Sequence, residues 1–182
     1  MSEAFPNRIG VVPRDFLIRS AQRSPGRAIV ICCETEPLEL PTLCRHFLHL
    51  AFDDLTQAQL QEASEDSRIK TMVLPSQTHV QQALEFARKF TDKTIFICCH
   101  AGVSRSPAIA WAILYDRTRN LKVATAQLFQ VAPYSLPHRD IIRYALEILE
   151  ADKAEDLYQK ADTLLKEREA SPAQETSWLN PL

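Results

Sequence analysis

Two short, apolar runs rich in β-branched residues, each of which ends in two adjacent cysteines, limit the folds that this chain can adopt. These runs are Ile29–Cys33, in "RAIVICCE", and Ile95–Cys99, in "TIFICCH". A strand that is buried on both faces is apolar along its whole length, whereas a strand with one wet face alternates. Both runs are therefore predicted to be central strands of a helix-covered sheet. The stretch "HFLHLAF" (46–52) is a third candidate strand.

Helical patterns alternate with these strands. Residues 76–90 carry apolar side chains at helical spacing, with Ser76 or Thr78 as the cap, and residues 106–118 are apolar nearly all round, as in a buried helix. Residues 120–133 and 138–169 predict two more amphipathic helices. In the polar stretch that follows Asp54, Thr56 and Gln59 have capping-box spacing, which predicts a short surface helix or a loop. The alternation predicts an α/β fold with a central, mostly parallel twisted sheet and helices on both faces.

Length and charge narrow the function classes. A chain of 182 residues is long enough for one core, expected over residues 8–150, with residues 151–182 as a helical extension and tail. The formal net charge of -2 provides no electrostatic footprint for nucleic acid or an anionic membrane. No apolar run is long enough to cross a bilayer, and the first residues do not resemble a signal peptide. We therefore expect a cytoplasmic protein without nucleic-acid or membrane partners.

The cysteines do not form a disulfide framework. There are five, an odd number, and four of them occur as two sequence-adjacent pairs. Adjacent cysteines cannot easily occupy two corners of a tetrahedron, and the chain has no Cys or His pair with zinc-finger spacing. The sequence therefore predicts no bound metal and free thiols.

The stretch "IFICCHAGVSRSP" (95–107) is the one that carries chemistry. A strand enters a small polar loop, and a helix leaves it. Arg105 follows Cys99 by six positions, and Ser106 comes next. Gly102 can adopt the positive φ that inward-pointing N–H groups need, and Pro107 falls in the first helical turn, where proline is favoured. The spacing from Cys98 to Arg105 is one residue longer, so we take Cys99 as the cysteine that the loop pairs with Arg105.

A loop of this kind is predicted to bind a tetrahedral anion. Several backbone N–H donors and the positive end of a helix dipole converge on one point, and the Arg105 guanidinium adds two parallel hydrogen bonds to phosphate oxygens. The same field stabilises a negatively charged sulfur, which makes Cys99 the candidate nucleophile. Ser106 can donate its hydroxyl to that sulfur when it leaves phosphorus. The phosphate-binding loop residues are His100, Ala101, Gly102, Val103, Ser104 and Arg105.

The stretch "CHAGVSRS" resembles the signature loop of the cysteine-dependent protein tyrosine phosphatase superfamily, closest to the dual-specificity branch. "PYSLPHRDIIRYALEIL" resembles the closing helix of a bacterial subgroup. The resemblance spans about residues 29–149 and implies the phosphotyrosine protein phosphatase-like fold. It also implies metal-independent, cofactor-free hydrolysis of phosphotyrosine through a phosphocysteine, with phosphoserine and phosphothreonine left open. The implied partners are a phosphorylated protein or a small phosphate ester, with inorganic phosphate or sulfate in the loop.

The resemblance further implies an aspartic acid that protonates the leaving group. Asp53 and Asp54 follow "HLAF". We prefer Asp54 because the subgroup carries its aspartate before an aliphatic residue, here Leu55, and we keep Asp53 as the alternative acid. Glu65 and Asp66 are outside candidates on a loop that could fold over the site.

One residue departs from the family pattern. The position before the nucleophile usually holds a histidine that buttresses the loop, and here it holds Cys98. Successive strand residues point to opposite faces, so Cys98 should point away from Cys99. Because of this departure, an alternative is that the chain is a pseudo-phosphatase, which binds phosphate but is catalytically weak or inactive. A rhodanese-like sulfurtransferase is a more distant alternative, because its loop is usually one residue shorter and needs neither Ser106 nor an upstream aspartate.

Overall fold

A parallel four-stranded sheet forms the centre of the molecule. The computed structural model describes residues 8–35, 40–62 and 71–171. The strand order is β1-β4-β2-β3, and each hydrogen-bonded pair of strands is parallel. The strands are β1 (Ile9–Pro13), β2 (Ile29–Cys33), β3 (His46–Leu50) and β4 (Ile95–Cys99). The three predicted strands are confirmed, whereas β1 was not predicted.

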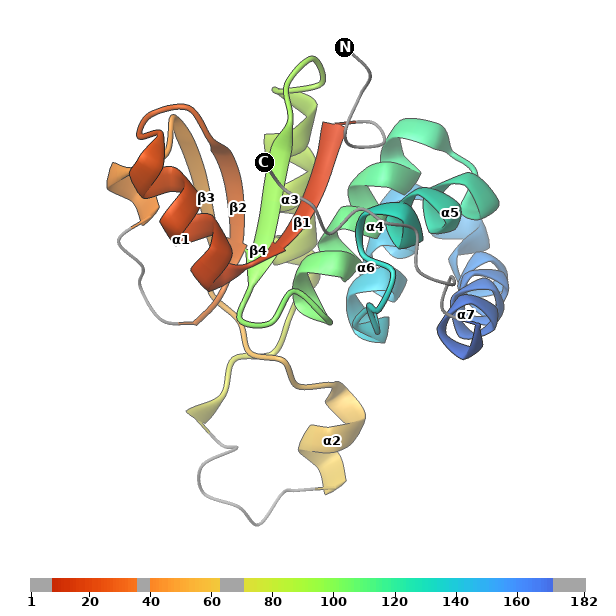
Figure 1. The fold of residues 1–182 in the computed structure, drawn as a ribbon. Coiled ribbons are helices and arrows are strands. Elements are labelled where there is room, and N and C mark those ends of the chain that lie inside the picture. The colour runs from red at the N-terminus through yellow and green to blue at the C-terminus, as the bar shows by residue number, and fades with distance from the viewer. Residues whose placement is uncertain (1–7, 36–39, 63–70, 172–182) are drawn as a thin grey trace.

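Helices cover both faces of this sheet (Figure 1). One face is covered by α1 (Arg14–Arg23). The other face carries a group of helices that share one apolar core with the sheet. They are α3 (Gln77–Arg88), α4 (Arg105–Thr118), α5 (Leu121–Val131), α6 (Arg139–Leu149) and α7 (Ala154–Ala170). The predicted α/β class, with helices on both faces, is confirmed.

The central strands β2 and β4 divide their side chains between two cores. Ile31 and Cys33 of β2 belong to the core beneath α3 to α7, whereas Val30 and Cys32 belong to the core beneath α1. The same alternation separates Cys99, in the first core, from Cys98, in the second. The alternation of side chains along β4 therefore places two adjacent cysteines in two different environments.

Helix α4 is the buried axis of the larger core. Its first eleven residues, from Arg105 to Tyr115, are all buried. Inside it, Trp111 is fully buried, and its indole Nε1–H donates to the Thr125 hydroxyl at 3.0 Å. A helix packed on every side cannot shift without disturbing its neighbours, so its first turn, which follows the loop after β4, is held firmly in place.

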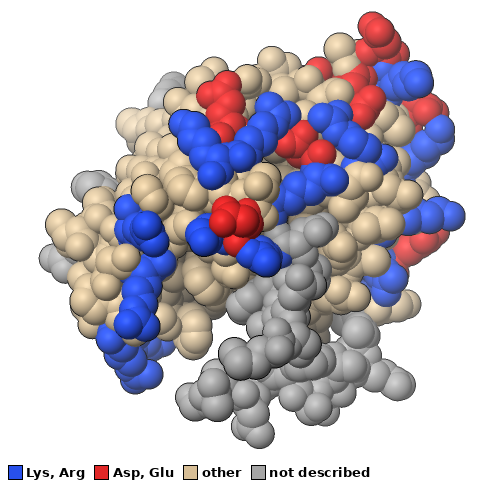
Figure 2. All heavy atoms as spheres, turned by 90° about the horizontal axis from the view of Figure 1, so that it is seen from above, with Lys and Arg blue, Asp and Glu red and all other residues tan. Residues whose placement is uncertain are grey.

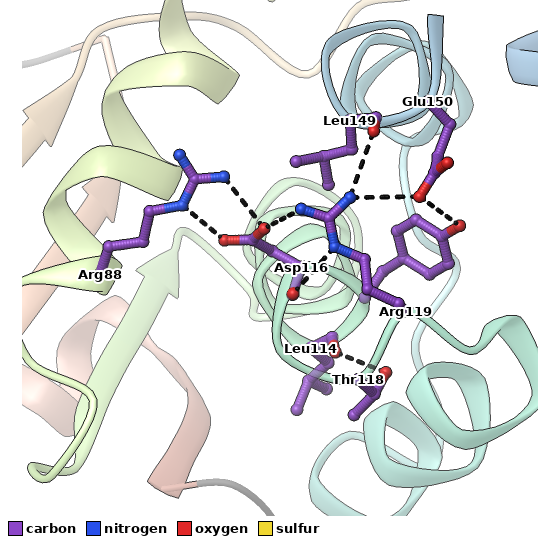
Figure 3. Close-up of polar contacts among 8 residues, drawn as sticks. Arg88, Leu114, Asp116, Thr118, Arg119, Leu149 and Glu150 are labelled. Atoms are coloured by element: carbon purple, nitrogen blue, oxygen red, sulfur yellow. Dashed lines mark hydrogen bonds and ion pairs between the residues drawn. The ribbon is translucent and has the colours of Figure 1, made fainter. Parts of the chain in front are cut away.

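The structure corrects the prediction of one continuous helix over residues 138–169. Helix α6 ends at Leu149, a short 3₁₀ helix (Ala151–Lys153) follows, and α7 then runs alongside α6 and α5. Arg119, from the end of α4, donates to the Leu149 carbonyl at 3.2 Å and pairs with Glu150 at 3.1 Å (Figure 3). This guanidinium binds backbone and side-chain acceptors that become available where α6 ends, and no local sequence signal marks the contact.

The C-terminal helix is part of the main body. Ala161 and Leu165 of α7 are fully buried in the larger core, and Arg139 of α6 pairs with Asp162 and Glu169 of α7. The apolar contacts and the ion pairs together attach α7 to α6.

Asp116 connects three helices through a polar network (Figure 3). Its carboxylate accepts hydrogen bonds from Arg88 of α3 at 2.8 and 3.0 Å and from Arg119 at 2.9 Å. Its side chain is only 11% exposed, although the two arginines are about half exposed. We expect Asp116→Asn to lower the free energy of unfolding by about 1 kcal/mol, because two charge-assisted partners lose their charge complement while the shape is kept.

Urea unfolding measures this loss. The matched control is Asp156→Asn on α7, which removes an ion pair with Lys160 between two well exposed side chains and should change the free energy by less than about 0.5 kcal/mol. Equal effects of the two substitutions would contradict the expectation that the Asp116 network stabilises the fold more than an exposed ion pair does.

Basic and acidic side chains lie side by side over much of the face seen in Figure 2, with a group of Lys and Arg along one edge. This face lies above the amino ends of the strands, where β2 enters the sheet in Figure 1.

Among the helices that the structure describes, none combines the length and hydropathy that crossing a bilayer requires.

Because the strands are parallel, their carboxyl ends meet at one edge of the sheet, and the segments that follow them are brought together there. These segments are the start of α1, Glu34 and Thr35 after β2, the aspartates after β3, and the loop after β4. The short helix α2 (Gln57–Glu62) projects from this edge in Figure 1 and is tied to α6 by the Gln57 N–H, which donates to Asp140 at 2.9 Å. The predicted capping box is confirmed, since Thr56 and Gln59 exchange hydrogen bonds.

Candidate active site

A cavity of about 460 Å³ opens at the carboxyl edge of the sheet. Its wall includes Cys99, most of the loop after β4, and Arg105. Asp53 and Asp54 lie on the wall as well, as do Glu34 and Thr35, which come directly after β2. This volume is that of a small-molecule site. It exceeds the space that one phosphate group needs, so the cavity also has room for part of the group to which a phosphate would be esterified.

Cys99 lies at the end of β4 beneath the loop. Its side chain is almost fully buried, and its Sγ is 3.1 Å from the Ser106 Oγ, which is also buried. Ser106 belongs to the first turn of α4, so the strand end and the helix start bring the two side chains together. A hydroxyl at this distance can donate a hydrogen bond to a negatively charged sulfur.

The neighbouring thiols are in environments that favour protonation. A side-chain hydrogen bond with Cys32 and burial raise the pKa of Cys98, and burial, followed by the nearby Cys99, raises the pKa of Cys33. Burial also raises the pKa of Cys44 to about 11. Because the thiolate is the reactive form, these three thiols are poor nucleophiles at neutral pH.

Arg105 is anchored along one side only. Its Nη1 donates to the Phe52 carbonyl at 3.0 Å, which fixes the plane of the guanidinium. Its Nη2 lies 3.7 Å from Glu34 Oε1, and its Nε lies 4.0 Å from Asp54 Oδ2. The buried Nε has no hydrogen-bond partner among the described residues, and neither has Glu34 Oε1. The Nε and Nη2 edge therefore faces these two carboxylates beyond hydrogen-bond distance, and a guanidinium edge of this kind can bind two oxygens of a phosphate.

The loop between Cys99 and Arg105 is held from both sides. Gly102 has φ +73°, and it sits against the backbone of Val12 and Pro13 at the end of β1. On the other side, the Leu136 N–H donates to the Val103 carbonyl at 2.8 Å, and the His138 N–H donates to the Ser104 carbonyl at 3.3 Å. These carbonyls bond outward to the protein. The loop is thus braced by two segments far away in sequence.

Gly102→Ala should disrupt this bracing. A Cβ there would lie 3.2 Å from Pro13 N and 3.3 Å from the Val12 carbonyl carbon, and the positive φ adds backbone strain. We expect a loss of about 2 to 3 kcal/mol in the free energy of unfolding, together with weaker binding of inorganic phosphate measured by calorimetry.

Gly26→Ala is the matched control for that experiment. Gly26 has φ +74°, but nothing lies within 4 Å of the position of its Cβ, so only the strain of the positive φ applies and about 1 kcal/mol should be lost. Phosphate binding should be unchanged. Equal losses in the two variants would show that the contact with β1 does not brace the loop.

The two adjacent aspartates after β3 face different partners. Asp54 accepts a hydrogen bond from Ser104 Oγ at 2.7 Å, and its side chain is 44% exposed. Asp53 accepts hydrogen bonds from the Thr35 hydroxyl at 2.6 Å and from the Val73 N–H at 2.7 Å. Asp54 therefore lies against the loop with access to solvent, whereas Asp53 ties two loops together. Glu65 and Asp66 lie outside the described residues.

Three residues of the wall, Arg14, Glu34 and Thr35, were not predicted from the sequence. Glu34 is 7% exposed, and its main-chain carbonyl accepts a hydrogen bond from His49 Nε2. Arg14 is the first residue of α1 and also lies on the wall. Glu34 directly follows a predicted buried strand, and its position at the carboxyl end of that strand could have identified it as a candidate site residue. Arg14 had no such signal, because β1 was not predicted.

The described residues contain no group of three His, Cys, Asp or Glu side chains arranged to hold a metal ion. The cavity's polar groups are instead the loop, the arginines Arg14 and Arg105, and the carboxylates of Glu34, Asp53 and Asp54.

No protein-family model and no curated protein matches this chain. Solved structures do. The crystal structure of DUSP15 matches with a TM-score of 0.58 and 15% sequence identity, over 92% of this chain and 96% of that one. A crystal structure of a mutant form of Tk-PTP matches with a TM-score of 0.54 and 17% identity, over 83% of this chain and 95% of that one. This chain therefore has the fold of the dual-specificity and protein tyrosine phosphatases.

Proposed function

We propose that this protein is a phosphomonoester hydrolase of the cysteine-dependent protein tyrosine phosphatase superfamily that works through a phosphocysteine and without a metal. The observation that carries the proposal is that Cys99 and Arg105 lie on the wall of one cavity. The sulfur has a hydroxyl partner 3.1 Å away, and Arg105 lies on the same cavity wall, with a guanidinium Nε that has no hydrogen-bond partner among the described residues. This arrangement holds a phosphate and presents a nucleophile to it.

In the first step, the Cys99 thiolate attacks phosphorus and forms the S–P bond while the ester P–O bond breaks. Arg105 and the N–H groups of the loop stabilise the charge that spreads over the three phosphoryl oxygens. Asp54, in its protonated form, gives its proton to the leaving oxygen. The 2.7 Å hydrogen bond from Ser104 supports this role, because it holds the Asp54 carboxyl beside the loop.

In the second step, water attacks the phosphocysteine. Its proton goes to the Asp54 carboxylate, the S–P bond breaks, and inorganic phosphate leaves. The electron pair of that bond returns to Cys99, where the Ser106 hydroxyl stabilises the thiolate. Asp53 has both carboxylate oxygens engaged by Thr35 and Val73, which supports a structural role for it rather than that of the acid.

The proposed substrates are phosphotyrosine and, with it, phosphoserine or phosphothreonine, on a protein or a small ester. We assign the reaction to residues 8–150 and regard residues 151–182 as an extension of the same domain, which the buried Ala161 and Leu165 of α7 support. The tail from residue 172, with Trp178, lies outside the described residues. The five free cysteines support a cytoplasmic location.

Hydrolysis of para-nitrophenyl phosphate in the presence of EDTA tests the proposal. The wild-type protein should release para-nitrophenolate and inorganic phosphate in equal amounts, and tungstate should inhibit it by occupying the loop. Thiosulfate with cyanide as acceptor is the parallel assay for sulfur transfer, and it should show no turnover.

An inert wild-type protein whose melting temperature tungstate still raises would replace the enzyme with a phosphate-binding module. Two features motivate this alternative: Cys98 stands where the family usually carries a histidine, and the sequence leaves the general acid open between Asp53 and Asp54. Turnover of thiosulfate instead of the ester would favour the sulfurtransferase.

A further inference from the structure

The charged side chains on the cavity wall differ in the hydrogen bonds and ion pairs that they make with the rest of the protein. Each carboxylate has a partner within the protein. Asp53 is bonded by Thr35 and Val73, Asp54 is bonded by Ser104, and Glu34 lies 3.7 Å from Arg105. The hydrogen bonds that Asp53 and Asp54 already accept occupy lone pairs that donors of a ligand would otherwise use.

Arg14 is the exception on this wall. Among the described residues, it has one hydrogen bond, from Nε to Asp15 at 3.3 Å. The Asp15 side chain is 71% exposed, whereas that of Arg14 is only 21% exposed. A pair with such an exposed partner is weak, because water competes for it. Within the described ranges, the Nη1 and Nη2 end of Arg14 therefore has no hydrogen-bond acceptor.

The backbone fixes where Arg14 stands relative to the loop. Its chain neighbour Pro13 is in register with Cys99 on the paired strands β1 and β4. Gly102 of the loop approaches the same Pro13 so closely that a Cβ would lie 3.2 Å from its nitrogen. Arg14 thus begins α1 directly beside the loop, while Arg105 approaches the cavity from the start of α4. Arg14 and Arg105 line one cavity and belong to different elements.

We propose that Arg14 is a specificity-determining residue that selects phosphate esters carrying a second anionic group next to the phosphate, either a carboxylate or another phosphate. The proposal rests on the proposed function for the first phosphate, which Arg105 and the loop would hold. Arg14 then binds the second group through the fork of Nη1 and Nη2, in exchange for its exposed contact with Asp15. Guanidinium suits both kinds of acceptor, since each offers two coplanar oxygens.

Binding of phosphopeptides to the Cys99→Ser variant tests the proposal without requiring turnover. The peptides share one sequence and carry glutamate, alanine or lysine on both sides of a single phosphotyrosine, and a fourth carries a second phosphotyrosine. We expect the glutamate peptide to bind about fivefold more tightly than the lysine peptide, the size of one partly exposed ion pair. The doubly phosphorylated peptide distinguishes a phosphate from a carboxylate as the preferred second group.

Adding Arg14→Gln should bring the glutamate-to-lysine binding ratio close to one, and Arg14→Lys should restore part of it, because the charge returns without the fork. Arg19→Gln is the matched control. It removes an exposed arginine of the same helix that is not part of the cavity wall, and it should leave the ratio unchanged. Raising NaCl from about 50 to about 300 mM should reduce the ratio in the parent but not in Arg14→Gln.

A ratio that Arg14→Gln leaves intact, or a preference for the lysine peptide in the parent, would overturn the proposal. If Arg14→Gln lowers the melting temperature, Arg14→Lys and its partial recovery of the ratio decide the matter instead. The proposed function fails separately. In that case the wild-type protein leaves para-nitrophenyl phosphate intact, while the binding ratio still follows the charge at position 14.

Discussion

Cys99→Ser is expected to lower the turnover of para-nitrophenyl phosphate by at least about a thousandfold, because the nucleophile is lost. A serine hydroxyl stays protonated at neutral pH, and its protonated form is a poor nucleophile toward phosphorus. The substitution is nearly isosteric at a buried position beside Ser106, so the fold and the affinity for inorganic phosphate should be kept. Initial rates, and phosphate binding measured by calorimetry, check the two halves of this result.

Cys98→Ser is the control, one residue away and on the other face of the sheet. Cys98 packs in the core beneath α1, and its hydrogen bond with Cys32 and its burial raise its pKa. Turnover should stay within about threefold of the wild type, because a buried hydroxyl there disturbs packing but not the loop. A large loss of activity from Cys98→Ser together with a small one from Cys99→Ser would reverse the assignment of the nucleophile.

Asp54→Asn is expected to slow hydrolysis of an alkyl phosphate by about a hundredfold or more, because the leaving alkoxide then receives no proton. With para-nitrophenyl phosphate the loss should be clearly smaller, since para-nitrophenolate leaves readily as an anion. An asparagine Oδ1 can still accept the hydrogen bond from Ser104 Oγ, so the loop geometry is preserved. The ratio of kcat values for the two esters is the measurement.

Asp53→Asn separates the two aspartates. Its amide group can replace only one of the two acceptors that Thr35 and the Val73 N–H use, so the variant should lose stability. Its effect on rate should be similar for both esters, because a loosened loop does not distinguish leaving groups. A leaving-group dependence in Asp53→Asn, with none in Asp54→Asn, would move the acid to residue 53.

Much of the fold could be predicted from local patterns. The β-branched runs of β2 and β4 are apolar on both sides, and the 76–90 stretch shows its cap and its stripe directly. The strand β1 could not be found in this way. Its five residues "IGVVP" include a glycine and a proline, and its strand character comes from pairing with β4, whose sequence lies far along the chain.

The candidate site divides in the same manner. Cys99, Gly102, Arg105 and Ser106 could be predicted because they lie within eight consecutive residues, whose spacing shows a strand, a loop and a helix start. The choice between Asp53 and Asp54 could only be ranked from the sequence, and the preference rested on the following leucine. The hydrogen bonds from Ser104 and Val73 provide a physical difference between these two residues.

Local patterns in the sequence were enough to predict β2, β3, β4 and most helices, and to single out one loop as the candidate anion site, because hydrophobic periodicity and turn chemistry act over a few residues. The contacts of the folded chain were needed to place Glu34 beside Arg105, to bring Arg14 to their cavity, and to end α6 where Arg119 meets Leu149 and Glu150. These contacts join residues separated by tens of positions. Their existence depends on the order in which parallel strands are assembled, and single segments carry no record of that order.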